Sequence, residues 1–127
     1  MTTVVDASAY VDLLLGRIPP RGRDHFDTDL AAPDLVYVEI ASGLSRAVRQ
    51  GPLSATHAAF LLEQVLVAPI DITPMADLVR RALELRDNLT VYDACYVALA
   101  EQLGCGILTA DARLARAPGL TVPFTLV

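Results

Sequence analysis

The sequence predicts an α/β fold in which helices cover both faces of a parallel β-sheet. Short apolar runs of strand length alternate with longer segments of helical periodicity along the whole chain. The first run, Thr3-Val4-Val5, is β-branched and short, which is typical of a buried strand. The 127 residues contain no repeat, low-complexity stretch or linker, so we expect a single domain spanning 1–127.

The first half of the chain supplies two of the expected strands and three of the helices. Strands are expected at 3–5 and 30–32, and helices at 8–15, 35–49 and 55–67. Gly16 and the prolines that follow end the first helix, and the polar segment 21–29 has room for a short helix only. Asp34 and Ser54 precede the next two helices and are good N-caps, because their side-chain oxygens accept hydrogen bonds from free N–H groups.

The second half continues the alternation. Strands are expected at 70–73, 106–109 and 121–122, and helices at 75–86, 91–103 and from 111 to the residues before Pro118. Pro74 suits the start of a helix because its φ is already helical. Thr90 is an N-cap for the helix that follows it, and Gly104 supplies the C-terminal stop.

Composition excludes several classes of protein. No apolar run approaches the roughly 20 residues of a membrane span, and no basic segment precedes the first apolar residues, so we expect a cytoplasmic protein. The two cysteines, Cys95 and Cys105, are too few for a disulfide scaffold or a zinc cluster and are interpreted as small buried groups. Hydrophobic residues make up 54%, enough for a core and for a surface that packs on a partner.

The net charge of −5 disfavours nucleic acid as a partner, because phosphate contacts usually need a basic surface. Two features weaken this argument. All ten basic residues are arginine, the better planar ligand for phosphate, although a biased genome composition explains the absence of lysine equally well. In addition, acids that hold a divalent cation are neutralised locally.

Two acids directly follow expected strands. Asp6 follows the first strand and Asp111 follows the strand at 106–109, and ligands of such sheets bind beyond the carboxyl ends of the strands. An N-cap or turn role is an equally good interpretation of each, with Ser8 as an alternative cap beside Asp6. The hydroxyl of Thr109 is placed to orient a carboxylate, or Thr109 is an ordinary strand residue.

Two further acids lie in helices of apolar sequence. Asp93 comes three residues after Thr90, which resembles a capping box, but an acid in so apolar a helix is costly to bury unless it is paired or bound to a cation. Glu39 has no basic residue at i+3 or i+4, and a solvated helix acid is the alternative interpretation.

Together the four acids predict one site at one edge of the sheet. Clustered carboxylates repel one another, so the cluster needs a cation, and oxygen-only ligands select hard ions such as Mg²⁺ or Mn²⁺. The expected ligands are Asp6, Asp93 and Asp111, with Glu39 binding the ion or orienting a water. The histidines His25 and His57, the serines, and three of the four tyrosines, Tyr37, Tyr92 and Tyr96, are interpreted as surface, helix or core-edge residues.

Four segments resemble the signature of the PIN-domain family, and the chain order resembles the VapC-type toxins of bacterial toxin–antitoxin pairs. They are Val-Val-Asp-Ala-Ser, Leu-Val-Tyr-Val-Glu-Ile-Ala-Ser-Gly-Leu, Thr-Val-Tyr-Asp-Ala-Cys-Tyr-Val-Ala-Leu-Ala and Leu-Thr-Ala-Asp-Ala-Arg-Leu. The resemblance covers essentially the whole chain. It implies a three-layer α/β/α sandwich with a parallel sheet of four or five strands.

The resemblance also implies a magnesium-dependent endoribonuclease, the toxin of a type II toxin–antitoxin system. The family's acidic constellation falls on Asp6, Glu39, Asp93 and Asp111, and its accompanying hydroxyl falls on Thr109. A metal-activated water would then cleave RNA phosphodiesters by in-line attack. The implied partners are RNA, an antitoxin whose basic group enters the acidic pocket, and a second copy of the chain in a homodimer.

Individual residues and missing motifs exclude several other functions. A phosphoacceptor receiver domain needs a lysine, which the chain lacks, and a dehalogenase-type phosphatase needs a second Asp where Ser8 stands. Walker A and dinucleotide-binding glycine patterns are absent. The alternative that stays open is a catalytically inactive PIN-like module that binds protein or RNA.

Overall fold

Five short strands form one parallel sheet in the computed structural model, which describes residues 1–127. The strands are β1 (Thr2–Val5), β2 (Asp29–Pro33), β3 (Asp71–Thr73), β4 (Ile107–Thr109) and β5 (Phe124–Leu126). Their order across the sheet is β3-β2-β1-β4-β5, so β1 is the central strand, with Val4 opposite Ala31 of β2 and Val5 opposite Leu108 of β4. The predicted α/β fold with a parallel sheet is confirmed, and the sheet has five strands.

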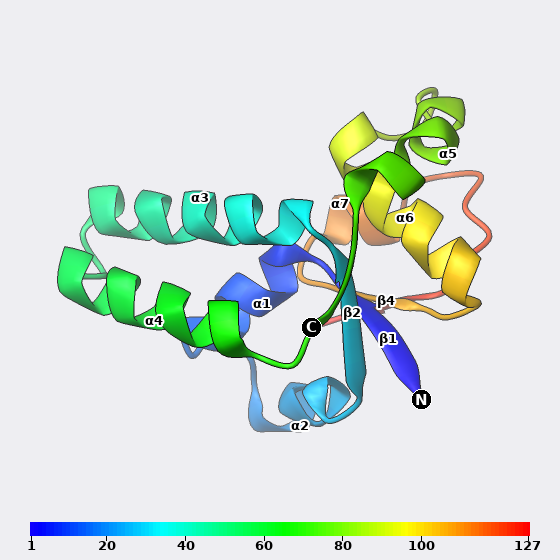
Figure 1. Cartoon of the computed structure of the whole chain (residues 1–127). Helices are drawn as coiled ribbons and strands as arrows, with labels where there is room; N and C mark the ends of the chain where they lie inside the picture. Colours follow the sequence, from blue (N-terminus) through cyan, green and yellow to red (C-terminus); the bar gives the residue numbers. More distant parts are fainter.

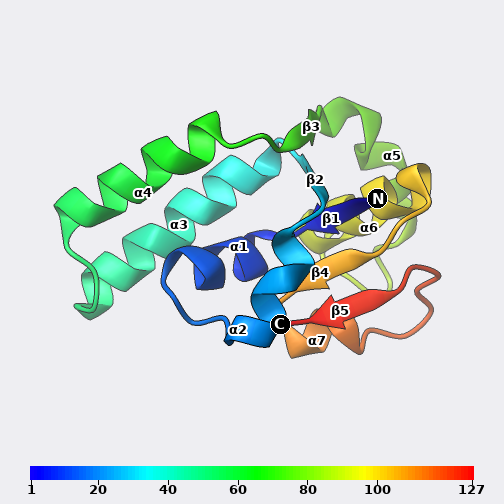
Figure 2. The same ribbon diagram turned by 90° about the horizontal axis from the view of Figure 1, so that it is seen from below.

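Helices lie on both faces of the sheet (Figures 1 and 2). They are α1 (Ala7–Leu14), α2 (Pro20–Arg23), α3 (Leu35–Gln50), α4 (Ala55–Val67), α5 (Val79–Glu84), α6 (Val91–Leu103) and α7 (Ala112–Ala115), with single 3₁₀ turns η1 (Asp24–Phe26) and η2 (Met75–Asp77). On one face α1 contacts β4 and α3 contacts β2, and α4 packs on α3 as a hairpin that extends away from the sheet. On the other face α6 lies across β1, β2 and β4 and is backed by α5. None of the helices combines the length and the apolar character that a bilayer crossing requires.

The apolar character of α6 follows from its position between the sheet and α5. All of its residues from Ala94 to Ala100 are buried, so this stretch is covered on every side rather than along one stripe. Asp93 and Thr90 precede the buried stretch at the carboxyl edge of the sheet, where the helix begins. The only polar or charged residues classed as buried in the whole chain are Asp6 and Thr109.

Three expectations about the elements are wrong in detail. The last strand lies at 124–126 and not at 121–122, because the carbonyl of Pro123 accepts a hydrogen bond from Ile107 N at 2.9 Å and brings the next residues alongside β4. The helix expected at 75–86 is divided into η2 and α5 and ends at Glu84. Asp34 lies at the start of α3 without capping it, since its backbone is already helical and its side chain accepts from Met75 N at 3.2 Å.

Candidate active site

Four acids from four separate elements lie toward the carboxyl edge of the sheet. Asp6 follows β1, Asp111 lies two residues after the end of β4, Glu39 lies in the second turn of α3, and Asp93 lies in the first turn of α6. The strand order reverses beside β1, and a reversal of this kind leaves a crevice at the edge of the sheet in which ligands bind. The topology therefore directs acids that are far apart in sequence to one region.

Asp6 is the most buried of these acids, with 4% of its surface exposed. Its Oδ1 accepts hydrogen bonds from Ala9 N at 2.9 Å and from the Ser8 hydroxyl at 2.7 Å, and its Oδ2 accepts one from the Thr109 hydroxyl. Asp6 is thus the N-cap of α1, and the alternative in which Ser8 caps that helix is wrong. Both carboxylate oxygens are held in place by donors from two elements.

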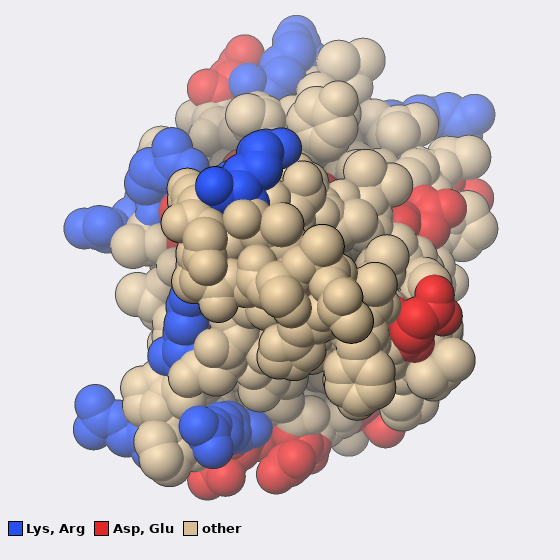
Figure 3. All heavy atoms as spheres, turned by 90° about the vertical axis from the view of Figure 1, so that its left-hand side faces the viewer, with Lys and Arg blue, Asp and Glu red and all other residues tan.

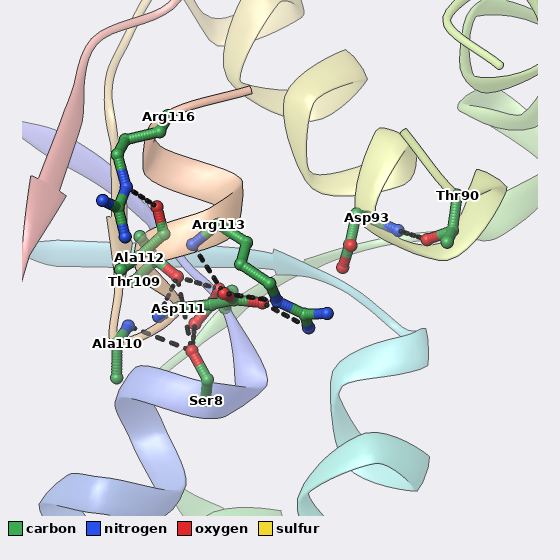
Figure 4. A network of polar contacts seen from close by, with 10 residues as sticks. Ser8, Thr90, Asp93, Thr109, Ala110, Asp111, Ala112, Arg113 and Arg116 are labelled. Carbon is green, nitrogen blue, oxygen red and sulfur yellow. Dashed lines mark hydrogen bonds and ion pairs between the residues drawn. The ribbon is translucent and has the colours of Figure 1, made fainter. Parts of the chain in front are cut away.

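Two hydroxyl groups, those of Ser8 and Thr109, connect Asp6 to the loop after β4. Figure 4 shows both side chains beside Ala110 and Asp111 of that loop. Thr109 Oγ1 accepts from Asp111 N at 3.0 Å, and Ser8 Oγ accepts from Ala110 N at 3.0 Å. Each hydroxyl therefore accepts from this loop and donates to Asp6. The orienting role expected for Thr109 agrees with this geometry, whereas Ser8 was not identified from the sequence as part of the site. The signal for Ser8 was its position two residues after Asp6, within reach of the same carboxylate.

At this edge of the sheet a hydrogen bond also joins two helices from opposite faces, α3 and α6. The hydroxyl of Tyr96 on α6 donates to Glu39 Oε1 on α3 at 2.6 Å. Tyr96 is 1% exposed, so its interpretation as a core-edge residue missed a fixed polar contact to a candidate acid. The available signal was spacing, because Tyr96 lies three residues after Asp93 and shares its helix face.

Asp93 and Asp111 lie at the starts of different helices, and in Figure 4 the Arg113 side chain extends from α7 toward the side on which Asp93 lies. Thr90 Oγ1 accepts from Asp93 N at 3.2 Å, which is the threonine half of a capping box. Asp111 caps α7 by accepting from Arg113 N at 2.9 Å, and it also forms an ion pair with the Arg113 guanidinium at 3.3 Å. The capping interpretation of Asp111 is therefore correct, but the same carboxylate also contributes negative charge beside Asp93.

The carboxyl groups alter one another's acidity. Burial raises the pKa of Asp6, Glu39 and Asp93 above their ordinary values, and the charge of Asp93 raises the first two further. The charge of Asp111 does the same for Asp93. Burial also acts to raise the pKa of Asp111, but the hydrogen bonds and charge of Arg113 outweigh it and lower the pKa overall. Three of the four acids thus lie where their negative charge is disfavoured, as in sites built for a cation.

The donor chemistry of this region fits a hard divalent cation. Carboxylate and hydroxyl oxygens surround it, and neither cysteine nor histidine contributes. The arrangement is looser than a formed coordination sphere, because no three Asp, Glu, His or Cys side chains lie close enough together to hold one ion. The acids therefore reach one region without forming a finished set of ligands.

A cavity of about 500 Å³ opens beside the acids and runs along the groove between α1 and α3. Glu39, Asp111 and Ser8 line one part of it. Arg17, Arg46 and Gln50 line another part. The site is thus the acidic part of a longer polar pocket.

Comparison with known proteins adds an independent finding. The sequence model of the PIN domain matches residues 3–120. Ribonuclease VapC9 of Mycobacterium tuberculosis is 40% identical over 124 residues, which cover 98% of this chain and 97% of that protein.

Solved structures give the same result for the fold. PAE2754 from Pyrobaculum aerophilum aligns with a TM-score of 0.69 and 25% identity, over 98% of this chain and 83% of that one. A toxin–antitoxin complex from Klebsiella pneumoniae contains a chain that aligns with a TM-score of 0.63 and 16% identity, over 98% of this chain and 99% of that one.

Proposed function

The chain belongs to the PIN-domain family, among its VapC ribonucleases, and we propose that it cleaves RNA at the acidic edge of the sheet, with Asp6, Glu39, Asp93 and Asp111 as its catalytic residues. One observation carries this assignment. Acids from four separate elements converge beside the central strand, and burial, with a further contribution from neighbouring carboxylates, raises the pKa of three of them. A purely structural group of charges would pair each acid with a base.

We propose Mg²⁺ as the cofactor, with Mn²⁺ as its substitute, held by Asp6, Asp93 and Asp111. When bound, such an ion lowers the pKa of water and stabilises the charge that develops on the phosphate oxygens. The protein's own contribution is positional. Ser8 and Thr109 fix the two oxygens of Asp6, and Tyr96 fixes one oxygen of Glu39, which leaves the other oxygen of Glu39 free to orient the attacking water.

A protein antitoxin and a second copy of this chain are the proposed partners besides RNA. The α3–α4 hairpin exposes large apolar side chains, with Val38 69%, Phe60 58% and Val67 82% exposed. Figure 3 looks onto the end of the molecule where α3 passes into α4, and shows it as largely uncharged at its centre, with most basic groups on the left and most acidic groups on the right and at the bottom. Exposed apolar area of this kind is typical of a surface that another protein covers. The proposed setting is the cytoplasm, with 1–127 acting as a single nuclease domain.

RNA cleavage by the purified full chain tests the catalytic proposal. The wild type, Asp6→Asn and Asp93→Asn are each incubated with total RNA, and the cleavage sites are found by mapping the new 5′ ends. Each incubation is done with and without about 5 mM Mg²⁺, a concentration above the dissociation constants of weakly held divalent ions. We expect specific cuts by the wild type in Mg²⁺ only, and no detectable cuts by either variant. Asparagine keeps the N-cap of α1, so Asp6→Asn should fold normally.

The matched control is Asp77→Asn, an exposed acid in η2 that is outside the site. It should cleave as the wild type does. Equal cleavage by Asp6→Asn would reject the assignment of the acids. A wild type that binds RNA but never cuts it would instead favour a catalytically inactive binding module.

A further inference from the structure

A polar stripe on α3 connects the acidic site to a basic group farther along the pocket. Glu39, Ser42, Arg46 and Gln50 lie three or four residues apart, so they project from one face of the helix, and all four line the cavity. At 1.5 Å per residue, Arg46 lies roughly 10 Å from Glu39 along the helix axis. The pocket therefore has a negative region and a positive region at a fixed separation.

The floor of the groove is set by a close approach of α1 and α3. A Cβ at Gly43 would lie 2.8 Å from Val11 Cγ2, so a larger residue at this position would force Val11 or the helices themselves to shift. Gly43 lies between Glu39 and Arg46 on α3, and both Gly43 and Val11 line the cavity. The close contact of Gly43 with Val11 therefore lies in the groove between the two charged regions. The separation of acid and base is thus built into the helix packing.

The arginines of this pocket are available for a ligand. Arg46 is exposed and forms neither a hydrogen bond nor an ion pair in the structure. The Arg17 side chain, in the turn after α1, has only a long contact of 3.5 Å to Asp12, an acid that also lines the cavity. By contrast, Arg81 and Arg113 are each held by carboxylates at 3.3 Å or less.

We propose that Arg46, assisted by Arg17, binds a phosphate of the RNA strand next to the phosphate that is cleaved. This inference rests on the proposed function and adds the residues that position its substrate. An RNA strand laid along the groove would place one phosphate at the acids, with their cation, and a neighbouring phosphate at the guanidinium groups. The cavity volume, about 500 Å³, lies within the range of small-molecule pockets and suits one nucleotide between them.

Charge also explains how an acidic protein holds RNA. The net charge of −5 gives no general attraction for a polyanion, so binding must depend on local basic groups. An unpaired arginine beside the active site supplies such a group where it also aligns the substrate. Arg46 is therefore expected to act on substrate binding more than on the chemical step.

Binding and cleavage of a labelled RNA by the full chain test this inference. Fluorescence anisotropy is measured with a fluorescein-labelled single-stranded RNA of about ten nucleotides, in the Asp93→Asn background so that the RNA stays intact, over a series of salt concentrations. We expect Arg46→Gln to weaken binding about 10-fold at low salt and to reduce the slope of log K against log salt by about 0.7, the value for one lost phosphate contact on a single strand. Arg46→Lys should recover most of the affinity.

The matched control is Arg80→Gln on α5, which removes the same charge from an exposed arginine outside the pocket. It should bind RNA as the parent does, and equal weakening by Arg46→Gln and Arg80→Gln would overturn the proposal. Stronger competition by an oligoglutamate peptide of equal charge than by unlabelled RNA would also overturn it, because the pocket would then suit an acidic protein segment.

Cleavage of the same RNA by otherwise wild-type protein separates this inference from the proposed function. Arg46→Gln should raise KM with little change in kcat. If the parent protein cuts no RNA while Arg46→Gln still weakens binding, the phosphate site stands and the nuclease assignment fails. If the parent cuts RNA and Arg46→Gln matches Arg80→Gln in both assays, the phosphate site fails alone.

Discussion

Two groups of charged side chains in this molecule differ in how their charges are paired and buried. On the surface of α5 and α6, Arg81 donates two hydrogen bonds to Glu101, at 2.7 and 3.1 Å, and one to Glu84 at 2.9 Å. At the carboxyl edge of the sheet, Asp6, Glu39 and Asp93 lie among other acids and polar hydroxyls. The first group joins opposite charges in solvent, and the second gathers like charges with partial burial.

The acidity of the two groups shows what each arrangement does. Hydrogen bonds from Arg81 lower the pKa of Glu101, so the ionised form stabilises the fold. Burial and neighbouring charge raise the pKa of Asp6 and Asp93, so their ionised forms destabilise it. A protein retains an unfavourable group of this kind where function requires it. The comparison therefore separates a cluster that stabilises the fold from the cluster that we propose as the active site.

Among three further substitutions that compare the two groups, the largest effect is expected from Tyr96→Phe, which removes one hydroxyl from the acidic region and keeps the ring. A hydrogen bond to a charged group is worth about 1.5–3 kcal/mol, so kcat for RNA cleavage should fall about 10- to 100-fold with KM nearly unchanged. Because this hydrogen bond lowers the pKa of Glu39, its loss should also move the acidic limb of the pH–rate profile to higher pH. A fall in kcat with an unmoved profile would show that Tyr96 only packs. Tyr37→Phe, with a partly buried ring on α3, is the control.

A smaller effect is expected on the stability of the metal-free protein. Asp93→Asn should raise the free energy of unfolding in EDTA at pH 7, because it removes a negative charge that burial and the charge of Asp111 disfavour. At Asp6 and Asp93 the raised pKa means that the folded protein binds more protons than the unfolded chain, so the contribution of these two acids to stability in EDTA should grow as the pH falls from 7 toward their ordinary values near 4. Adding Mg²⁺ should raise the Tm of the wild type more than that of Asp93→Asn. Chemical denaturation and thermal scans measure both, and a less stable Asp93→Asn would contradict the comparison.

The smallest effect is expected in the surface cluster. Glu101→Gln should cost less than about 1 kcal/mol of stability at neutral pH, because exposed ion pairs contribute little, and salt should reduce the difference. The pKa of Glu101 is lowered in the folded state, so this contribution is present above its ordinary value and is lost as the pH falls through the lowered one. RNA cleavage should be unchanged. Reduced RNA cleavage by Glu101→Gln would contradict the interpretation that the surface cluster around Arg81 contributes to stability and not to cleavage.

Much of the fold could be predicted because its signals are local. Ser54 and Thr90 cap their helices as expected, each accepting from the N–H three residues later, and Gly51 and Gly104 end α3 and α6 in the left-handed conformation. The error at the last strand has the same origin. Thr121 and Val122 have strand-like side chains, but pairing with β4 begins after Pro123, and only the partner strand decides the register.

The sequence by itself determined the order of strands and helices and predicted the four acids of the proposed site, because periodicity, capping and the position of a residue after a strand are properties of neighbouring residues. Only the tertiary structure decided which groups meet those acids. The bonds from Tyr96 to Glu39 and from Ala110 to Ser8 join residues 57 and 102 positions apart. The pairing of an acidic and an arginine-lined region in one pocket likewise depends on the packing of α1 against α3, and no local pattern encodes contacts of such length.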